Sequence, residues 1–165
     1  MKPALLVIDL QKKFFNLNQT CSDSLKSAIE YINQTILLFR NKGFPVVIIQ
    51  HKNESEGLIE GNEAFEVYES VKLDQQDLRI VKTYGNAFTK TMLAEKLREF
   101  GVDTVIITGF CAEECVLSTY IGADDNDFTP IILRSAIASD NPGHVGFVEE
   151  ISNLVSIGAL KKLLE

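Results

Sequence analysis

The chain has 165 residues, of which 45% are hydrophobic and 24% are charged. This length suits one domain with a buried core and is too short for two, so we expect a single domain over residues 1–165. Lys and Arg total 16 against 23 Asp and Glu, and the net charge of -7 argues against binding to nucleic acid or to a membrane surface. No apolar run is long enough to span a bilayer and no signal sequence is recognisable, so we expect a soluble, cytoplasmic protein.

The three cysteines, Cys21, Cys111 and Cys115, form an odd and sparse set. We therefore expect no disulfide framework. With only two histidines and no close cluster of His and Cys, a structural zinc site is not expected either. Reduced thiols remain, and one of them is a candidate nucleophile.

In chain order, the first half alternates strand, helix and strand. The continuous apolar run at residues 4–8 predicts a strand buried on both faces, and residues 45–51 repeat that pattern. Between them, apolar residues spaced three and four apart over 22–42 predict an amphipathic helix that ends at Gly43. The following segment, 52–78, has no sustained period, which in a compact domain indicates a functional or subunit-contacting segment.

The second half continues the alternation. Strands are predicted at 79–82, 103–108, 130–133 and 154–157, and helices at 89–100, 112–123 and 145–153, followed by a last helix. We expect Gly109 to end the strand at 103–108. The alternation implies right-handed crossovers and an α/β fold, a three-layer α/β/α sandwich around a doubly wound, mostly parallel, Rossmann-like sheet. We expect about six strands in the order 3-2-1-4-5-6.

Three chemically versatile side chains lie where predicted strands end. Asp9 ends the first strand, Lys82 the third, and Cys115 follows the fourth, near the start of the next helix. In this fold ligands bind beyond the carboxyl ends of the strands. A carboxylate there could accept a thiol proton, a lysine could hold the carboxylate ionised, and the helix start would favour a thiolate. Each residue alone is more often structural, but their joint placement predicts an activated nucleophile with its base.

The turn before Cys115 has one glycine, Gly109, followed by bulkier residues. This excludes a P-loop and a dinucleotide-binding fingerprint. Backbone N–H groups of the turn could instead form an oxyanion hole beside the thiol. Glu113 and Glu114 either stabilise the helix start or repel anionic substrates, and the sequence leaves both open.

Three motifs, in order, resemble those of the isochorismatase-like cysteine hydrolases, the superfamily that includes nicotinamidase and N-carbamoylsarcosine amidase. Residues 9–14 resemble D-x-Q-x-x-F, residues 82–93 resemble the lysine motif, and residues 109–119 resemble G-x5-C-V-x-x-T. The resemblance covers almost the whole chain.

The resemblance implies a hydrolase that acts on the C–N bond of a small amide or carbamoyl substrate. Cys115 would attack the carbonyl carbon, Asp9 would serve as general base and then acid, and Lys82 would assist electrostatically. Water would then hydrolyse the thioester. The resemblance also implies a cis Phe110–Cys111 peptide, an oxyanion hole made by the backbone N–H groups of Cys111 and Cys115, and a homo-oligomer, a dimer or a tetramer.

The substrate pocket is less well defined by the sequence. Nicotinamidases carry a D-x-H metal motif after the second strand, whereas this chain has Gln50, His51 and Lys52 there, so we expect neither a metal nor a cofactor. His51 either lines the pocket or bonds to a neighbouring loop. Four aromatic residues beside the motifs could wall an apolar pocket or belong to the core: Phe14, Phe15, Phe88 and Phe110.

A rival hypothesis is a non-catalytic or redox-acting member of the same fold. It would bind a small molecule or a partner through residues 52–78, with Cys115 incidental to function. Its redox form requires a reversible disulfide between Cys111 and Cys115, for which the sequence lacks the usual C-x-x-C spacing.

Overall fold

A single six-stranded sheet organises the molecule, and the computed structural model describes all residues, 1–165. All neighbouring strands pair in parallel, and their order is β3-β2-β1-β4-β5-β6, which confirms the predicted order. The strands are β1 (Pro3–Ile8), β2 (Val46–His51), β3 (Leu78–Lys82), β4 (Thr104–Phe110), β5 (Thr129–Ala138) and β6 (Leu154–Val155). The helices are α1 (Lys12–Phe15), α2 (Gln19–Lys42), α3 (Leu93–Glu99), α4 (Leu117–Asp125), α5 (Pro142–Ile151) and α6 (Ile157–Leu163).

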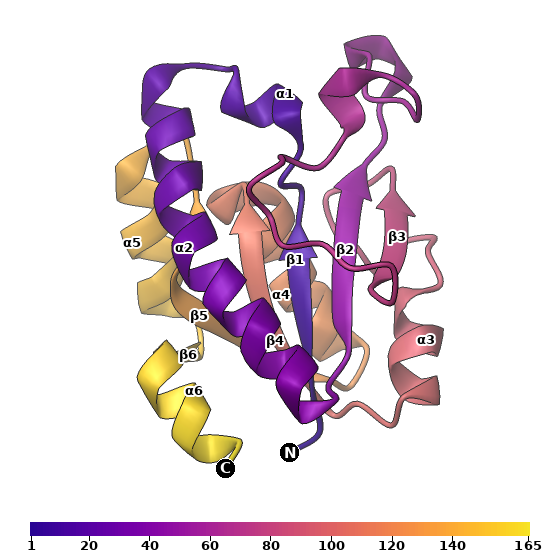
Figure 1. Ribbon diagram of the computed structural model, residues 1–165, viewed down its shortest axis with the longest axis vertical. Coiled ribbons are helices and arrows are strands. Elements are labelled where there is room, and N and C mark those ends of the chain that lie inside the picture. The colour runs from indigo at the N-terminus through magenta and orange to yellow at the C-terminus, as the bar shows by residue number, and fades with distance from the viewer.

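The helices cover both faces of the sheet (Figure 1). Apolar side chains of α2 and α6 join one core cluster of 23 buried residues, and those of α3, α4 and α5 join a second cluster of 20. The central strand β1 is buried along its whole length and supplies alternate residues to the two clusters. A continuous apolar run is therefore what this position requires, because both faces of the strand are covered. None of the helices is long and apolar enough to cross a membrane.

The helix boundaries differ from the prediction where caps and backbone conformation decide them. α2 begins at Gln19 rather than at residue 22, because the Asn18 side chain accepts a hydrogen bond from Cys21 N and caps the helix. α3 begins at Leu93 rather than at residue 89, because Lys90 has a positive φ of 54° that no right-handed helix contains.

Two strands run further than their apolar runs indicated. β4 continues through Gly109 to Phe110, so the prediction that Gly109 ends this strand is wrong. β5 continues to Ala138, where it pairs with Phe110 after a shift in register. Each strand continues because the other supplies hydrogen-bond partners for its backbone at the carboxyl end of the sheet.

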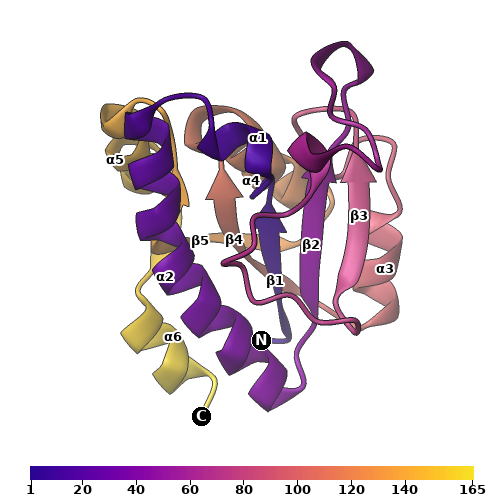
Figure 2. The same ribbon diagram turned by 45° about the horizontal axis from the view of Figure 1, so that its top comes forward.

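The crossover from β2 to β3 contains no α-helix, as its lack of period predicted. It forms two short 3-10 turns, Glu54–Glu56 and Glu63–Phe65, and then returns across the α2 face of the sheet (Figure 2). Val67 and Val71 of the return segment join the core cluster that α2 also joins. The crossover thus lies against the carboxyl ends of β1 and β2 and borders the site there.

Candidate active site

Asp9, Lys82 and Cys115 come together at the carboxyl edge of the sheet. Asp9 follows β1 directly, and its positive φ of 53° turns the chain out of the strand. Lys82 is the last residue of β3 and pairs in register with His51, the last residue of β2. Cys115 lies in the turn between β4 and α4. β2 and β4 flank β1, so parallel pairing brings all these strand ends to one edge.

The ammonium of Lys82 is the centre of this group. Its Nζ lies 2.9 Å from Asp9 Oδ2 and donates to Cys115 Sγ at 3.2 Å. It also lies 3.1 Å from the Tyr84 carbonyl oxygen and 3.1 Å from His51 Nδ1. The Lys82 side chain is fully buried and that of Asp9 nearly so. Asp9 Oδ1 is buried without any hydrogen-bond partner, so one oxygen of the carboxylate remains available to a proton donor.

Burial dominates the electrostatics of the group. It raises the pKa of the Asp9 carboxyl, while the Lys82 ammonium acts in the opposite direction. It also raises the pKa of the Cys115 thiol to about 12; the Asp9 carboxylate adds to this shift and Lys82 opposes it. Burial therefore disfavours the thiolate of Cys115, which is opposite to the effect expected of the helix start. Attack by Cys115 needs a base at the moment of reaction.

His51 and Gln11 define the wall beside Lys82. Burial, and then the charge of Lys82, lower the pKa of His51, so its imidazole is neutral and Nδ1 can accept from Lys82. The buried Gln11 side chain donates to His51 O at 3.0 Å and accepts from His51 N at 2.8 Å. Gln11 therefore fixes the end of β2 against the chain leaving β1. The sequence identified Gln11 only as part of a motif and assigned it no role.

The residues at the end of β2 do not fit a metal centre. His51 presents Nδ1 to the Lys82 ammonium, which would repel a cation at that nitrogen. The Gln50 amide donates to Phe65 O at 3.0 Å and so is already used in holding the crossover. No carboxylate stands at the neighbouring position, which is Lys52.

The aromatic residues divide between the site and the core. Phe14 and Phe110 lie together, with ring centroids 5.0 Å apart, and Phe110 directly precedes Cys111 of the Cys115 turn. Phe15 is buried and stacks on Tyr68 on one face of the sheet. Phe88 is buried in the other core cluster, where it stacks on Phe128. The four rings do not form one wall, since two of them pack into opposite layers.

Cys115 lies in a five-residue π-helical turn, Ala112–Val116, that precedes α4. Val116 N donates to Cys111 O at 3.1 Å, the five-residue spacing that defines such a turn. The peptide bond between Phe110 and Cys111 is cis. Gly109 lies so close to the backbone of Ile8 that a side chain there would overlap the Ile8 carbonyl group. The turn therefore begins at a tight junction of β1 and β4.

Access to the group is through Cys115. Its side chain is partly exposed, whereas Asp9 and Lys82 are buried. Two surface cavities, of about 280 and 480 Å3, lie elsewhere, one beside Arg40 and Asp77 and one between α2 and α5. Neither includes Asp9, Lys82 or Cys115.

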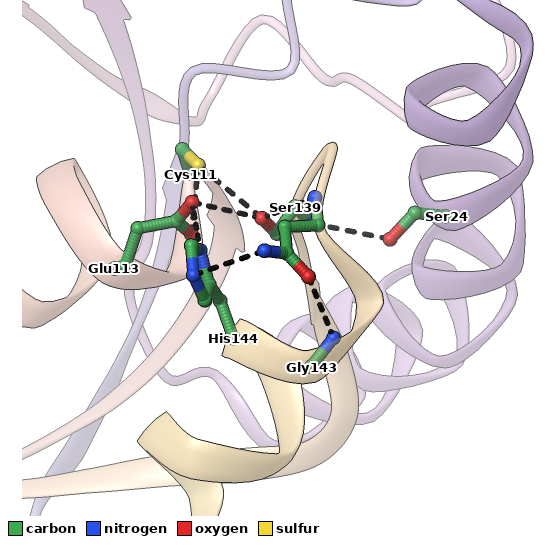
Figure 3. A network of polar contacts seen from close by, with 7 residues as sticks. Ser24, Cys111, Glu113, Ser139, Gly143 and His144 are labelled. Carbon is green, nitrogen blue, oxygen red and sulfur yellow. Dashed lines mark hydrogen bonds and ion pairs between the residues drawn. The ribbon is translucent and has the colours of Figure 1, made fainter.

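A second polar cluster adjoins the turn and was not predicted from the sequence (Figure 3). The Glu113 carboxylate accepts from the Cys111 thiol, from the Ser139 hydroxyl and from His144 Nδ1. All three cysteines are free, and the Cys111 thiol is directed to Glu113. Only the register of β4 with β5 could have indicated this cluster, because it places Cys111 and Ser139 after paired residues.

Comparison with known proteins identifies the family of the chain. The isochorismatase domain model matches residues 3–155. An uncharacterised isochorismatase family protein of Bacillus subtilis, YrdC, is 31% identical over 140 residues, which are 84% of this chain and 74% of that protein. Maleamate amidohydrolase of Pseudomonas putida is 26% identical over 153 residues, 82% of this chain and 72% of the enzyme.

A solved structure extends the comparison. N-carbamoylsarcosine amidase of Thermoplasma acidophilum superposes with a TM-score of 0.80 at 25% identity, covering 94% of this chain and 95% of that one. The family model matches most of the sequence, and the superposition extends over almost the whole chain. The chain belongs to the isochorismatase-like hydrolase family.

Proposed function

We propose that this protein is a cysteine hydrolase that cleaves the C–N bond of a small amide or carbamoyl compound. The observation that carries the proposal is the position of the buried Lys82 ammonium, 2.9 Å from Asp9 and 3.2 Å from Cys115. A thiol, a carboxylate and a cation in this arrangement form a nucleophile, its base and the charge that keeps the base ionised. The amidohydrolases among the relatives support the same reaction class.

In the first half of the reaction, Asp9 accepts the thiol proton while Cys115 Sγ bonds to the carbonyl carbon. The negative charge that develops on the carbonyl oxygen is stabilised by the backbone N–H groups of Cys111 and Cys115. Asp9 then returns the proton to the leaving nitrogen as the C–N bond breaks. Ammonia or an amine departs and a thioester remains on Cys115. The raised pKa of the thiol makes this transfer to Asp9 necessary.

In the second half, water replaces the amine. Asp9 accepts a proton from the water as its oxygen attacks the thioester carbon, and the proton returns to Cys115 Sγ as the C–S bond breaks. The acid is released and the thiol is restored. Lys82 holds Asp9 ionised between these transfers, because its ammonium opposes the effect of burial on the pKa of Asp9.

The pocket that we propose for the substrate has His51 on one side and Phe14 with Phe110 on the other. The neutral His51 ring offers a hydrogen-bonding edge, and its neighbours Lys13 and Glu56 are paired at 2.6 Å. Phe15 and Phe88 contribute through the core that supports this pocket. A small, uncharged amide fits such a wall best, since the nearest surface charges neutralise each other.

The test is a screen of primary amides, carbamoyl compounds and ureides with ammonia release as the readout. Turnover should be lost in Cys115→Ala and retained in the matched control Cys21→Ser. Cys21 is a buried thiol of α2 that donates to Phe14 O, a bond that serine preserves.

Intact mass spectrometry of a stopped reaction should detect an acyl adduct on the wild type and none on Cys115→Ala. If Cys115→Ala turned over a substrate at the wild-type rate, the proposal would be wrong. If the protein hydrolyses no compound of the screen and a reversible Cys111–Cys115 disulfide forms under peroxide, the redox-acting alternative would be favoured instead.

A further inference from the structure

The most connected polar side chain outside the triad is Glu113, two residues before Cys115. Its Oε2 accepts from the Cys111 thiol at 3.0 Å. Its Oε1 accepts from the Ser139 hydroxyl at 3.0 Å and from His144 Nδ1 at 2.6 Å. One carboxylate thus joins the start of the turn to residues that follow β5.

The protons of this cluster are fixed by its own bonds. Asn141 Oδ1 accepts from Gly143 N, which directs Nδ2 of the same amide to His144 Nε2 at 3.1 Å. Nε2 therefore accepts, and the proton of the imidazole lies on Nδ1 and is donated to Glu113. The Ser139 hydroxyl accepts from Asn141 N at 3.0 Å and so has its own proton free for Glu113.

Glu113 is suited to accept three donors at once. Burial raises the pKa of its carboxyl. The hydrogen bonds that it accepts, above all those from Cys111 and His144, together lower the pKa by more, so the net pKa is below the ordinary value. Burial raises the pKa of the Cys111 thiol and the Glu113 bond adds to the shift, so this sulfur stays a donor. An ionised carboxylate can accept all three of these donors through its two oxygens.

The cluster anchors the turn to three separate elements (Figure 3). Ser139 follows the end of β5, and His144 lies in the first turn of α5. Ser139 N also donates to Ser24 Oγ of α2 at 3.1 Å, so the anchor extends to the opposite face of the sheet. The turn itself has only short-range backbone bonds, such as Glu114 N to Cys111 O at 3.1 Å.

We infer that Glu113 is the positioning residue of the oxyanion hole: by holding the Cys111 side chain against Ser139 and His144, it fixes where the backbone N–H groups of Cys111 and Cys115 point. This inference rests on the proposed function, because it assigns Glu113 to the hydrolytic transition state. The Glu113 side chain makes no hydrogen bond to Cys115, Asp9 or Lys82. It therefore acts through the turn. The sequence suggested that Glu113 stabilises the helix start or repels anionic substrates, and neither role requires these hydrogen bonds.

The experiment compares Glu113→Gln with Glu114→Gln. Both remove one negative charge from the same turn, but Glu114 is exposed and its side chain makes no hydrogen bond in the structure. Glutamine at 113 keeps the shape of the side chain and cannot accept three donors. We expect kcat to fall about 10- to 100-fold in Glu113→Gln with KM within about twofold of wild type, and no comparable change in Glu114→Gln.

The rate at which iodoacetamide alkylates Cys115 distinguishes this role from a general loss of structure, because a general loss of structure would change that rate. This displacement has no tetrahedral oxyanion, so its rate should stay within about twofold in Glu113→Gln while kcat falls. A second pair tests the link at Cys111, where Cys111→Ser keeps a donor for Glu113 and Cys111→Ala removes it. The serine variant should have a higher kcat than the alanine variant, and the alanine variant should lose as much as Glu113→Gln.

Three results would overturn the inference. The first is equal kcat in Glu113→Gln and wild type. The second is a parallel fall of alkylation and kcat, which would make Glu113 a general support of the fold. The third is an equal loss in Cys111→Ser and Cys111→Ala. Absence of amide turnover in the wild type would instead refute the proposed function and this inference together.

Discussion

The two oxygens of Asp9 have different surroundings, and the difference matches two tasks. Oδ2 is paired with Lys82, whereas Oδ1 is buried and unpartnered. An unsatisfied buried acceptor costs about 1–3 kcal/mol, so a donor from a substrate or a water recovers stabilisation there. Oδ1 is therefore the atom we assign to proton transfer, while Oδ2 keeps the carboxylate ionised.

This assignment predicts the acid limb of the pH profile. Only ionised Asp9 can accept the thiol proton, and burial raises its pKa above the ordinary value of 3.8. As the pH falls, Asp9 becomes protonated before ordinary aspartates do, so kcat/KM should fall through an apparent pKa above 3.8. Asp9→Asn should lower kcat/KM at least about 1000-fold at pH values above this acid limb.

The matched control for Asp9→Asn is Asp103→Asn, an exposed carboxylate at the opposite edge of the sheet. It should leave the profile unchanged. An acid limb that persists in Asp9→Asn would show that another group titrates, and Asp9 would lose its role.

At the scale of the elements, the junction of β1 and β4 is the tightest point near the site. Gly109 pairs with Ile8 in the parallel ladder and has a φ of 114°. A Cβ would meet the Ile8 backbone, which cannot rotate aside as a side chain can. The turn that follows thus starts from a position that only glycine occupies without strain.

Gly109→Ala should therefore lower the free energy of unfolding by about 3 kcal/mol or more, measured by urea denaturation. The control is Gly146→Ala in α5, where a Cβ meets nothing within 4 Å. That change should be neutral or stabilising by up to about 1 kcal/mol, because alanine favours a helix more than glycine does. Similar midpoints for the two variants would contradict the tight junction.

At the scale of the whole molecule, the triad lies at the edge of a sheet whose two faces carry core clusters of similar size, 23 and 20 residues. Asp9 follows the doubly buried strand β1, Lys82 ends the edge strand β3, and Cys115 lies in the turn after β4. The site therefore depends on the packing of both layers, and the partly exposed Cys115 is its point of access.

The family resemblance also predicts assembly. We expect light scattering coupled to size exclusion to give twice or four times the chain mass of 18.4 kDa. The measurement should be repeated across a tenfold range of protein concentration, because association depends on it. A constant mass of one chain would show that the protein acts as a monomer.

Much of this organisation could be predicted from the sequence because it depends on local patterns. Buried parallel strands need continuous apolar runs, and the strand ends then place Asp9, Lys82 and Cys115 at one edge. The four-residue helix α1 left no pattern, because so short an element has no period. The raised pKa of Cys115 also could not be predicted, since burial causes it and burial depends on the assembled site.

The Glu113 cluster escaped prediction for a different reason. Ser139 and His144 lie 26 and 31 positions from Glu113 along the chain. Their proximity follows from β5 reaching Ala138, whereas the apolar run indicated a strand that ended at residue 133. Because the predicted end of β5 was too early, the sequence did not indicate that Ser139 and His144 lie beside the turn.

The crossover between β2 and β3 is held by backbone bonds on either side of residues 54–63 and by the fully buried side chain of Leu58 within them. Glu66 O accepts from Lys12 N at 2.9 Å, and Tyr68 N donates to Leu10 O at 2.8 Å. Between these and β2, residues 54–63 contact α1 mainly through surface ion pairs such as Lys12 with Glu63. Such pairs contribute little to stability, so the exposed residues of this stretch can be substituted at little cost while Leu58 stays apolar. These exposed positions are therefore the ones to vary in a redesign that leaves the buried triad unchanged.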